Sequence, residues 1–138
     1  RAAGGQVLGP DSSSFKYSLG GFTTLRGFGW GEFEGSKMAM ASAEFRFTFI
    51  EGLKFGFPLF FGVGGIGGVI FADAGSAWDG KFQMYDSTGR YKDLHADAGF
   101  GFRLALAPLV SLRLDFAWPY NNRNFGSVNT LFSLGIDY

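Results

Sequence analysis

Few side chains in this sequence have the chemistry of a catalytic or metal-binding centre. Two pairs, Asp97 with Arg103 and Asp115 with Arg113, combine a carboxylate with a nearby guanidinium, which could support acid–base chemistry. Charges of alternating sign on one strand face more often form a salt-bridged polar wall, so we expect no enzymatic activity. His95 is the only histidine and cysteine is absent, so we predict no metal site and interpret His95 as a polar residue near an outer rim.

One string of glycines has the spacing of a nucleotide-binding motif. Residues 62–67 read Gly-Val-Gly-Gly-Ile-Gly, a GxGxxG pattern that binds pyrophosphate where it follows a strand and begins a helix. It does neither here, so we interpret the glycines as positions of close strand packing or a thinned wall. The formal net charge is zero, and no charge excess indicates nucleic acid. We therefore predict no cofactor and no nucleic-acid partner.

Arg26, in the stretch Leu25-Arg26-Gly27-Phe28, is the charged residue whose position most needs a partner. Glycines on both sides of it let the backbone turn back on itself. Leu25, Phe28 and Trp30 are too apolar for a loop that only faces water, so we expect the loop to fold against the rest of the chain. A buried arginine needs an anionic partner. The sequence therefore predicts a carboxylate on an interior surface, and a solvated loop arginine is the alternative.

The rest of the chain reads as strands. Glycine supplies 23 of the 138 residues and aromatic residues 19%, a composition that disfavours helices and favours β structure. From Lys37 onwards apolar and polar residues alternate, which is the period of a strand with two different faces. Residues 55–72 are uncharged over 18 positions, but one proline and six glycines argue against a transmembrane helix. The alternation predicts five strands after a glycine-rich loop at 1–36, at about 37–50, 60 or 64–78, 94–106, 110–120 and 128–138.

Strand length and the composition of the two faces favour a membrane barrel. Strands of about 10 to 15 residues exceed the roughly 5–6 of soluble sheets and reach the length that a tilted transmembrane strand needs. The polar face consists of Gly, Ala, Asp and Arg, which suits a watery interior better than a soluble exterior. Long polar loops alternate with the short turn at Pro108, which predicts loops outside and turns on the periplasmic side. Large aromatic residues lie at strand ends, as interfacial girdles require: Trp78, Trp118, Tyr120 and Tyr138.

Six segments, in order along the chain, closely resemble the C-terminal barrel of the BamA/TamA outer-membrane assembly family. This family is also called the bacterial surface antigen family and includes two-partner secretion transporters. The resemblance extends from about residue 15 to the end and is carried by LGGFTTLRGF (19–28), AEFRF (43–47), FADAGSAWD (71–79), GFGFRL (99–104), LRLDFAWP (112–119) and LFSLGIDY (131–138).

The resemblance implies an all-β fold in which this chain is a portion of a longer, sixteen-stranded antiparallel transmembrane barrel. Residues 1–36 would be a loop whose LRGF tip folds into the lumen, and residues 37–138 would be the last five meander strands. The first eleven strands and the periplasmic POTRA repeats would lie in preceding sequence.

The resemblance also implies roles for individual residues. Arg26 would enter the lumen and pair with Asp73, with Glu44 nearby, and the alternation independently puts both carboxylates on the polar face. Two further groups follow from the family pattern. The rest of the loop motif is Leu25, Gly27 and Phe28, and the C-terminal assembly signal is Phe132, Leu134, Ile136 and Tyr138.

By the same resemblance the protein is integral to the outer membrane of a Gram-negative bacterium or an equivalent organelle. Its partners would be membrane lipid, polypeptide substrates and subunits of an assembly machinery. The leading hypothesis is a non-enzymatic barrel that inserts outer-membrane proteins or exports polypeptides. Two alternatives stay open: a passive anchor for a fused N-terminal domain, such as a patatin-like lipase, and a small porin or adhesin barrel, against which the Arg26 loop argues.

Overall fold

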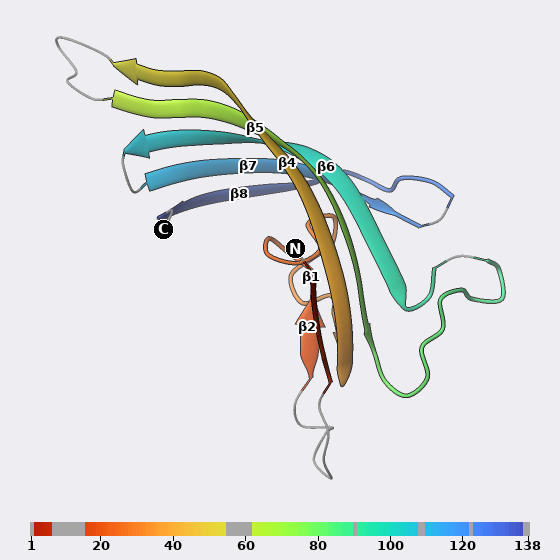
Figure 1. The fold of residues 1–138 in the computed structure, drawn as a ribbon. Helices are drawn as coiled ribbons and strands as arrows, with labels where there is room; N and C mark the ends of the chain where they lie inside the picture. Colours follow the sequence, from red (N-terminus) through yellow and green to blue (C-terminus); the bar gives the residue numbers. More distant parts are fainter. Residues whose placement is uncertain are drawn as a thin grey trace.

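The computed structural model describes residues 2–6, 16–54, 62–89, 91–107, 110–121 and 123–136. They form one curved antiparallel sheet in the order β1-β4-β5-β6-β7-β8 and a small two-stranded sheet of β2 and β3 (Figure 1). The strands are β1 (Ala2–Gln6), β2 (Tyr17–Leu19), β3 (Phe33–Gly35), β4 (Lys37–Lys54), β5 (Gly62–Trp78), β6 (Leu94–Ala107), β7 (Val110–Tyr120) and β8 (Asn129–Ile136).

The five predicted strands are confirmed as β4 to β8, and each pairs with the next along the chain. Strand β4 continues past Glu51-Gly52, where the sequence predicted its end. The pairing is instead irregular a little earlier, with a register shift between Thr48 and Ile50. A bulge of this kind lets a long strand bend without ending, so β4 continues beyond it. The stretch 62–72 belongs to β5, and no helix among the described residues is long and apolar enough to cross a membrane.

The N-terminal region differs from the predicted loop. Strand β1 pairs with β4 from Ala2 opposite Ala41 to Gln6 opposite Lys37, and β2 pairs with β3. The sequence of β1 is Ala-Ala-Gly-Gly-Gln, which lacks the branched and aromatic residues that signal a strand. Its pairing follows instead from the neighbour, because β4 would otherwise present a row of unpaired backbone groups.

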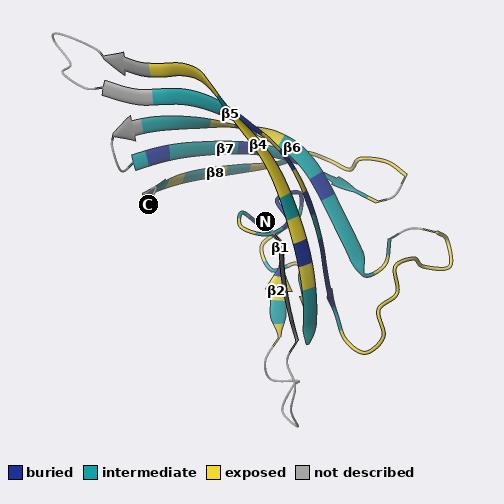
Figure 2. Ribbon diagram, viewed as in Figure 1, coloured by how far each residue is buried: buried dark blue, intermediate teal, exposed yellow. Residues whose placement is uncertain are grey.

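The two faces of the sheet are the reverse of those in a soluble protein. Large apolar side chains on one face are exposed, and we call this the outer face. It includes Phe45, Phe49, Ile70, Phe100, Phe102, Phe132 and Leu134. The opposite, inner face carries the buried charged residues Asp73, Asp97 and Asp115. Exposed residues occur along β4 and again along β8 (Figure 2). An apolar exterior with a charged interior is typical of a wall of a transmembrane barrel.

The sheet curves around the N-terminal loop, which lies in its hollow (Figure 1). Within the described residues the sheet ends at β1 and at β8 and does not close on itself. The fold is therefore a partial barrel whose inner face is covered by the loop between β2 and β3.

Candidate functional site

The loop between β2 and β3 is held in a closed shape by its own backbone. Gly20 and Gly21 have φ angles of 119° and 90°, a region that side chains disfavour. The Gly21 N–H lies 3.0 Å from the Leu25 carbonyl oxygen and 3.2 Å from that of Phe28, and the Phe28 N–H donates to Leu25 at 3.2 Å. A side chain at Gly20 would also collide with the Gly29 carbonyl oxygen. The glycines thus allow a tight loop with Arg26 at its tip.

Leu25 fixes one side of the loop to the sheet. It is fully buried together with Leu19, and both pack against Met40 and Ala77. Gly75 of β5 makes room for them, since an added Cβ there would lie 3.3 Å from Leu19 and 3.4 Å from Leu25. Burying a leucine contributes roughly 1.5–3 kcal/mol, so the loop has an apolar anchor beside its charged one.

Aromatic rings fix the other side of the loop. Phe33 stacks on His95 with ring centroids 3.4 Å apart, and Phe28 meets Phe33 edge-on at 5.0 Å. His95, expected near a rim, is thus part of the packing around the loop. Trp30, in contrast, is 82% exposed, so the expectation that it folds inward is wrong. Its backbone and ring lie against Gly21, so the tryptophan covers the solvent-exposed side of the loop.

Arg26 forms a forked ion pair with Asp73. Its Nε atom lies 2.8 Å from Asp73 Oδ2 and its Nη2 atom 3.1 Å from Oδ1, and Nη2 also lies 2.7 Å from Glu44 Oε1. Arg26 is 4% exposed and Asp73 2%. Planar, two-bond contacts between guanidinium and carboxylate are among the strong polar contacts in proteins. The structure therefore brings together the three residues that the family resemblance grouped.

The guanidinium is enclosed by further contacts. Its Cζ atom lies 3.6 Å from the centroid of the Phe71 ring, a cation–π arrangement, and Ser42 Oγ donates to Asp73 Oδ1. Burial opposes the charge of Arg26, yet its hydrogen bonds to Asp73 and Glu44 and the charges of both carboxylates raise its pKa. Arg26 is consequently charged at neutral pH.

The backbone of the loop tip is held by different strands. Asn129 of β8 donates from Nδ2 to the Arg26 carbonyl oxygen at 2.9 Å and to that of Phe28 at 3.3 Å. Gly27 lies so close to β6 and β7 that an added Cβ would be 2.6 Å from Asp97 Cβ and 2.9 Å from the Pro119 nitrogen. Only glycine fits there. The loop motif thus binds β4 and β5 through a side chain and β6 to β8 through its backbone.

Strand register explains how the wall accommodates the loop. One cross-strand row runs through Glu44, Phe71, Gly99, Ala117 and Asn129. The ends of this row supply contacts to the loop, while its middle is small: an added Cβ at Gly99 would lie 2.6 Å from the Phe71 ring. The glycine- and alanine-rich polar face therefore provides space for Phe71 and the loop.

A second group of charges lies beside the first. Arg103 forms a forked pair with Asp115, with Nη2 3.1 Å from Oδ2, and Arg113 lies 3.7 Å from the same carboxylate. Arg103 therefore pairs across strands with Asp115 rather than with Asp97 on its own strand. Asp97 is 2% exposed, and Gly27 of the loop packs directly against its side chain. Its cross-strand neighbour is Asp73.

The residues of the expected C-terminal signal lie apart from the loop. Phe132 and Leu134 are 65% and 61% exposed on the outer face of β8, and Ile136 is the last residue of that strand. Tyr138 lies outside the described residues. Two apolar side chains at alternate positions of an edge strand provide a surface that a neighbouring strand or lipid can cover.

Sequence reasoning missed several residues that hold the loop. Phe71 had a signal, because an aromatic residue on an otherwise polar face is out of pattern. Asn129 had none beyond its place on that face, and neither had Asp115, which lies 3.9 Å from Arg26 Nη1, since these contacts join residues far apart in the chain. Among the described residues no group of three or more His, Asp or Glu side chains is arranged to hold a metal. The arrangement positions a loop, and the carboxylates of Glu44, Asp73 and Asp115 are each paired with an arginine.

Comparison with known families gives one match. The family model described as the Omp85 superfamily domain matches residues 10–138. Neither the curated proteins nor the solved structures include a significant match to this chain.

Proposed function

Because the chain belongs to the Omp85 superfamily, we propose that it forms the C-terminal wall of an outer-membrane barrel that inserts outer-membrane proteins or exports polypeptides. At the level of the family, this is an outer-membrane barrel of the assembly and translocation type, which works on polypeptide substrates. The finer assignment, a BamA/TamA-like protein with POTRA repeats before the barrel, is our proposal from the segment resemblances. So are the assembly-machinery partners.

The forked contact between Arg26 and Asp73 is the observation that carries this proposal. A barrel that only anchors another domain has no need for a loop that carries a buried charge onto its inner wall. Such a charge is expensive to desolvate, and it is retained where it specifies one arrangement. Here it fixes the loop against β4 and β5, while Asn129 and Gly27 attach the same loop to β6, β7 and β8.

In this proposal the loop braces the wall during passage of a polypeptide. Contacts at Asp73 and at Asn129 lie on different strands, so a docked loop fixes their relative positions. We propose that the protein performs no catalysis, because Glu44, Asp73 and Asp115 are each engaged by an arginine. Chemistry at such carboxylates would require that these ion pairs break first.

The test is Arg26→Ala in the intact protein that carries this sequence, with Arg123→Ala as control. Arg123 is exposed in the loop after β7 and donates to the Thr88 carbonyl oxygen at 2.9 Å. We expect Arg26→Ala to reduce the amount of folded outer-membrane protein or exported polypeptide, while its own barrel still migrates as a folded, heat-modifiable species. Undiminished assembly and export in a variant with a freed loop would favour the passive-anchor alternative.

A further inference from the structure

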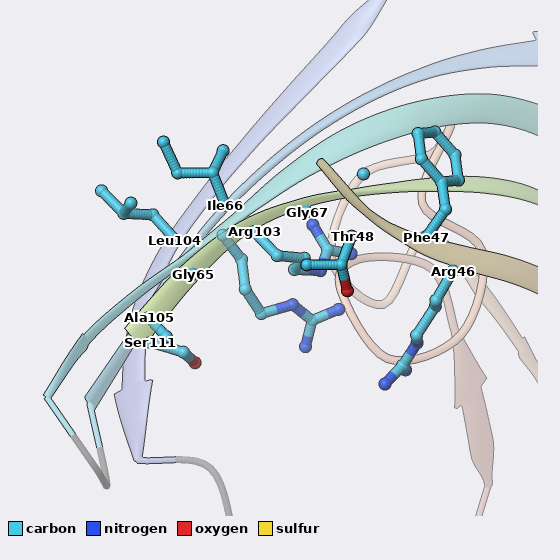
Figure 3. Close-up of a pocket in the computed structure, with 12 residues that line it drawn as sticks. Arg46, Phe47, Thr48, Gly65, Ile66, Gly67, Arg103, Leu104, Ala105 and Ser111 are labelled. Carbon is cyan, nitrogen blue, oxygen red and sulfur yellow. The ribbon is translucent and has the colours of Figure 1, made fainter. Parts of the chain in front are cut away.

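A group of three arginines borders a cavity on the inner face, next to the Arg26 contact. Arg46 of β4, Arg103 of β6 and Arg113 of β7 line a cavity of about 410 Å³. Figure 3 shows Arg46, Arg103, Thr48 and Ser111 on one side of the sheet, with Ile66 and Leu104 on the other. The cavity has the size of a small-ligand site.

The carboxylates near the cavity are too few to pair with these arginines one to one. Asp115 is shared, because Arg103 holds it through a fork while Arg113 stands 3.7 Å away. Glu44 is also shared, between Arg46 at 2.7 Å and Arg26 at 2.7 Å. Moreover, Arg103 and Arg113 are direct cross-strand partners, and like charges in that position repel. The cavity therefore has a local excess of positive charge.

Two hydrogen-bond donors beside the cavity have no acceptor. Ser111 is 5% exposed, and neither its hydroxyl nor the Arg113 Nε has a hydrogen-bond partner among the described residues. Residues 111 and 113 lie on the same face of β7, because side chains alternate along a strand. Buried donors without acceptors are uncommon and costly. An oxyanion in the cavity would accept hydrogen bonds from the Ser111 hydroxyl and the Arg113 Nε. Its negative charge would also offset the repulsion between Arg103 and Arg113.

The position of the cavity indicates where such an anion comes from. The three arginines lie on the face opposite the exposed aromatic residues, so the headgroup of a surrounding lipid does not reach them. Ser111 is one residue beyond the start of β7 and Arg103 is four residues before the end of β6. These strand ends flank residues 108–109, which lie outside the described residues and where the sequence predicts a short turn on the periplasmic side, from which a polypeptide substrate would approach.

We propose that the cavity bordered by Arg46, Arg103 and Arg113 binds the carboxylate of an Asp or Glu side chain of a polypeptide substrate. The guanidinium groups and the Ser111 hydroxyl would hold the two carboxylate oxygens, with Arg113 donating from its Nε, which has no hydrogen-bond partner among the described residues. This inference rests on the proposed function, because it assumes that a polypeptide passes the inner face. A free phosphate ion has similar chemistry, and the experiment separates the two sources.

The experiment measures binding to the intact protein in detergent at low salt. The probes are a fluorescent peptide with three consecutive glutamates, the same peptide with three glutamines, and inorganic phosphate as competitor. We expect the glutamate peptide to bind and the glutamine peptide not to bind. Arg113→Gln should weaken binding about tenfold or more, because it removes a charged donor, and Ser111→Ala should weaken it several-fold. Arg123→Gln, on an exposed loop, should leave the affinity unchanged.

Equal binding of both peptides, or unchanged affinity in Arg113→Gln and Ser111→Ala, would overturn the proposal. Binding of phosphate, measured separately, without binding of either peptide would show a site for small anions only and would also overturn it. Heat-modifiability shows that each variant is folded, and Ser111→Ala removes only one oxygen. The result is independent of the Arg26 experiment: absent peptide binding with impaired Arg26→Ala assembly overturns this inference alone. Peptide binding with fully active Arg26→Ala overturns the proposed function alone.

Discussion

Removal of Arg26 should release the loop while the sheet stays folded, and the size of the effect follows from its partners. At 4% and 2% exposure, Arg26 and Asp73 are close to the limit at which breaking a buried pair costs about 3–5 kcal/mol. After Arg26→Ala, the hydrogen bond that the Asp73 carboxylate keeps among the described residues is the one from the Ser42 hydroxyl. After Asp73→Ala, Arg26 keeps Glu44 at 2.7 Å and Asp115 at 3.9 Å. We therefore expect Arg26→Ala to cost more than Asp73→Ala, about 3–5 against about 2–3 kcal/mol.

This cost should appear as easier opening of the loop. Protease cleavage between Phe22 and Trp30 in the folded intact protein reports the free energy of that opening. Arg26→Lys should recover part of the protection, since an ammonium cannot make the forked contact of a guanidinium. A double-mutant cycle of Arg26→Ala and Asp73→Ala should give a coupling energy of at least about 1 kcal/mol. Additive effects, or equal cleavage of all variants, would refute the assignment of these residues as partners.

Three further predictions test the remaining parts of the structure. Gly27→Ala should raise cleavage of the loop even with Arg26 intact, because its Cβ would lie 2.6 Å from Asp97 Cβ; protection equal to that of the native protein would contradict the close packing. Phe100→Arg on the outer face should lower the free energy of unfolding in lipid by about 2–4 kcal/mol, whereas Thr48→Arg on the inner face should lower it little. Equal losses of unfolding free energy in lipid-refolding titrations would contradict the assignment of the two faces. Gly101 is unsuitable as the inner-face control because a side chain there would meet Asp115 Oδ1. Phe132→Ser and Leu134→Ser should lower the outer-membrane level of the protein, measured against Thr130→Ser, and unchanged levels would remove the targeting role from β8.

Much of the sheet was predictable because its faces are chemically distinct. Strands β6 and β7 alternate almost without exception, and their predicted bounds agree with the structure to within a residue. The same alternation put Glu44 and Asp73 on the inner face, and only the family resemblance joined them to Arg26. Strand β1 could not be predicted, since its small residues carry no pattern and its pairing depends on the free edge of β4.

The less predictable features depend on contacts between distant residues. Trp30 looked like a buried residue by type, yet the turn at the glycines leaves it exposed. Asn129 is an ordinary polar residue on the inner face until register aligns it with Ala117, Gly99 and Phe71 beneath the loop. The abundance of glycine on this face was interpreted as a thin wall or close strand packing, and the space beside Gly99 and Gly75 is filled by Phe71 and by Leu19 and Leu25.

Thiol labelling of the loop tests the central claim, that the loop is docked on the inner face by Arg26, most directly. The sequence has no cysteine, so a single cysteine substitution can be labelled without a signal from other thiols in this sequence. Leu25 is fully buried and Trp30 is 82% exposed on the same loop. In the intact protein, we expect a maleimide to label Trp30→Cys rapidly and Leu25→Cys slowly, and Leu25→Cys to become reactive once Arg26→Ala is added. Labelling of Leu25→Cys as fast as Trp30→Cys with Arg26 present would contradict the docked loop.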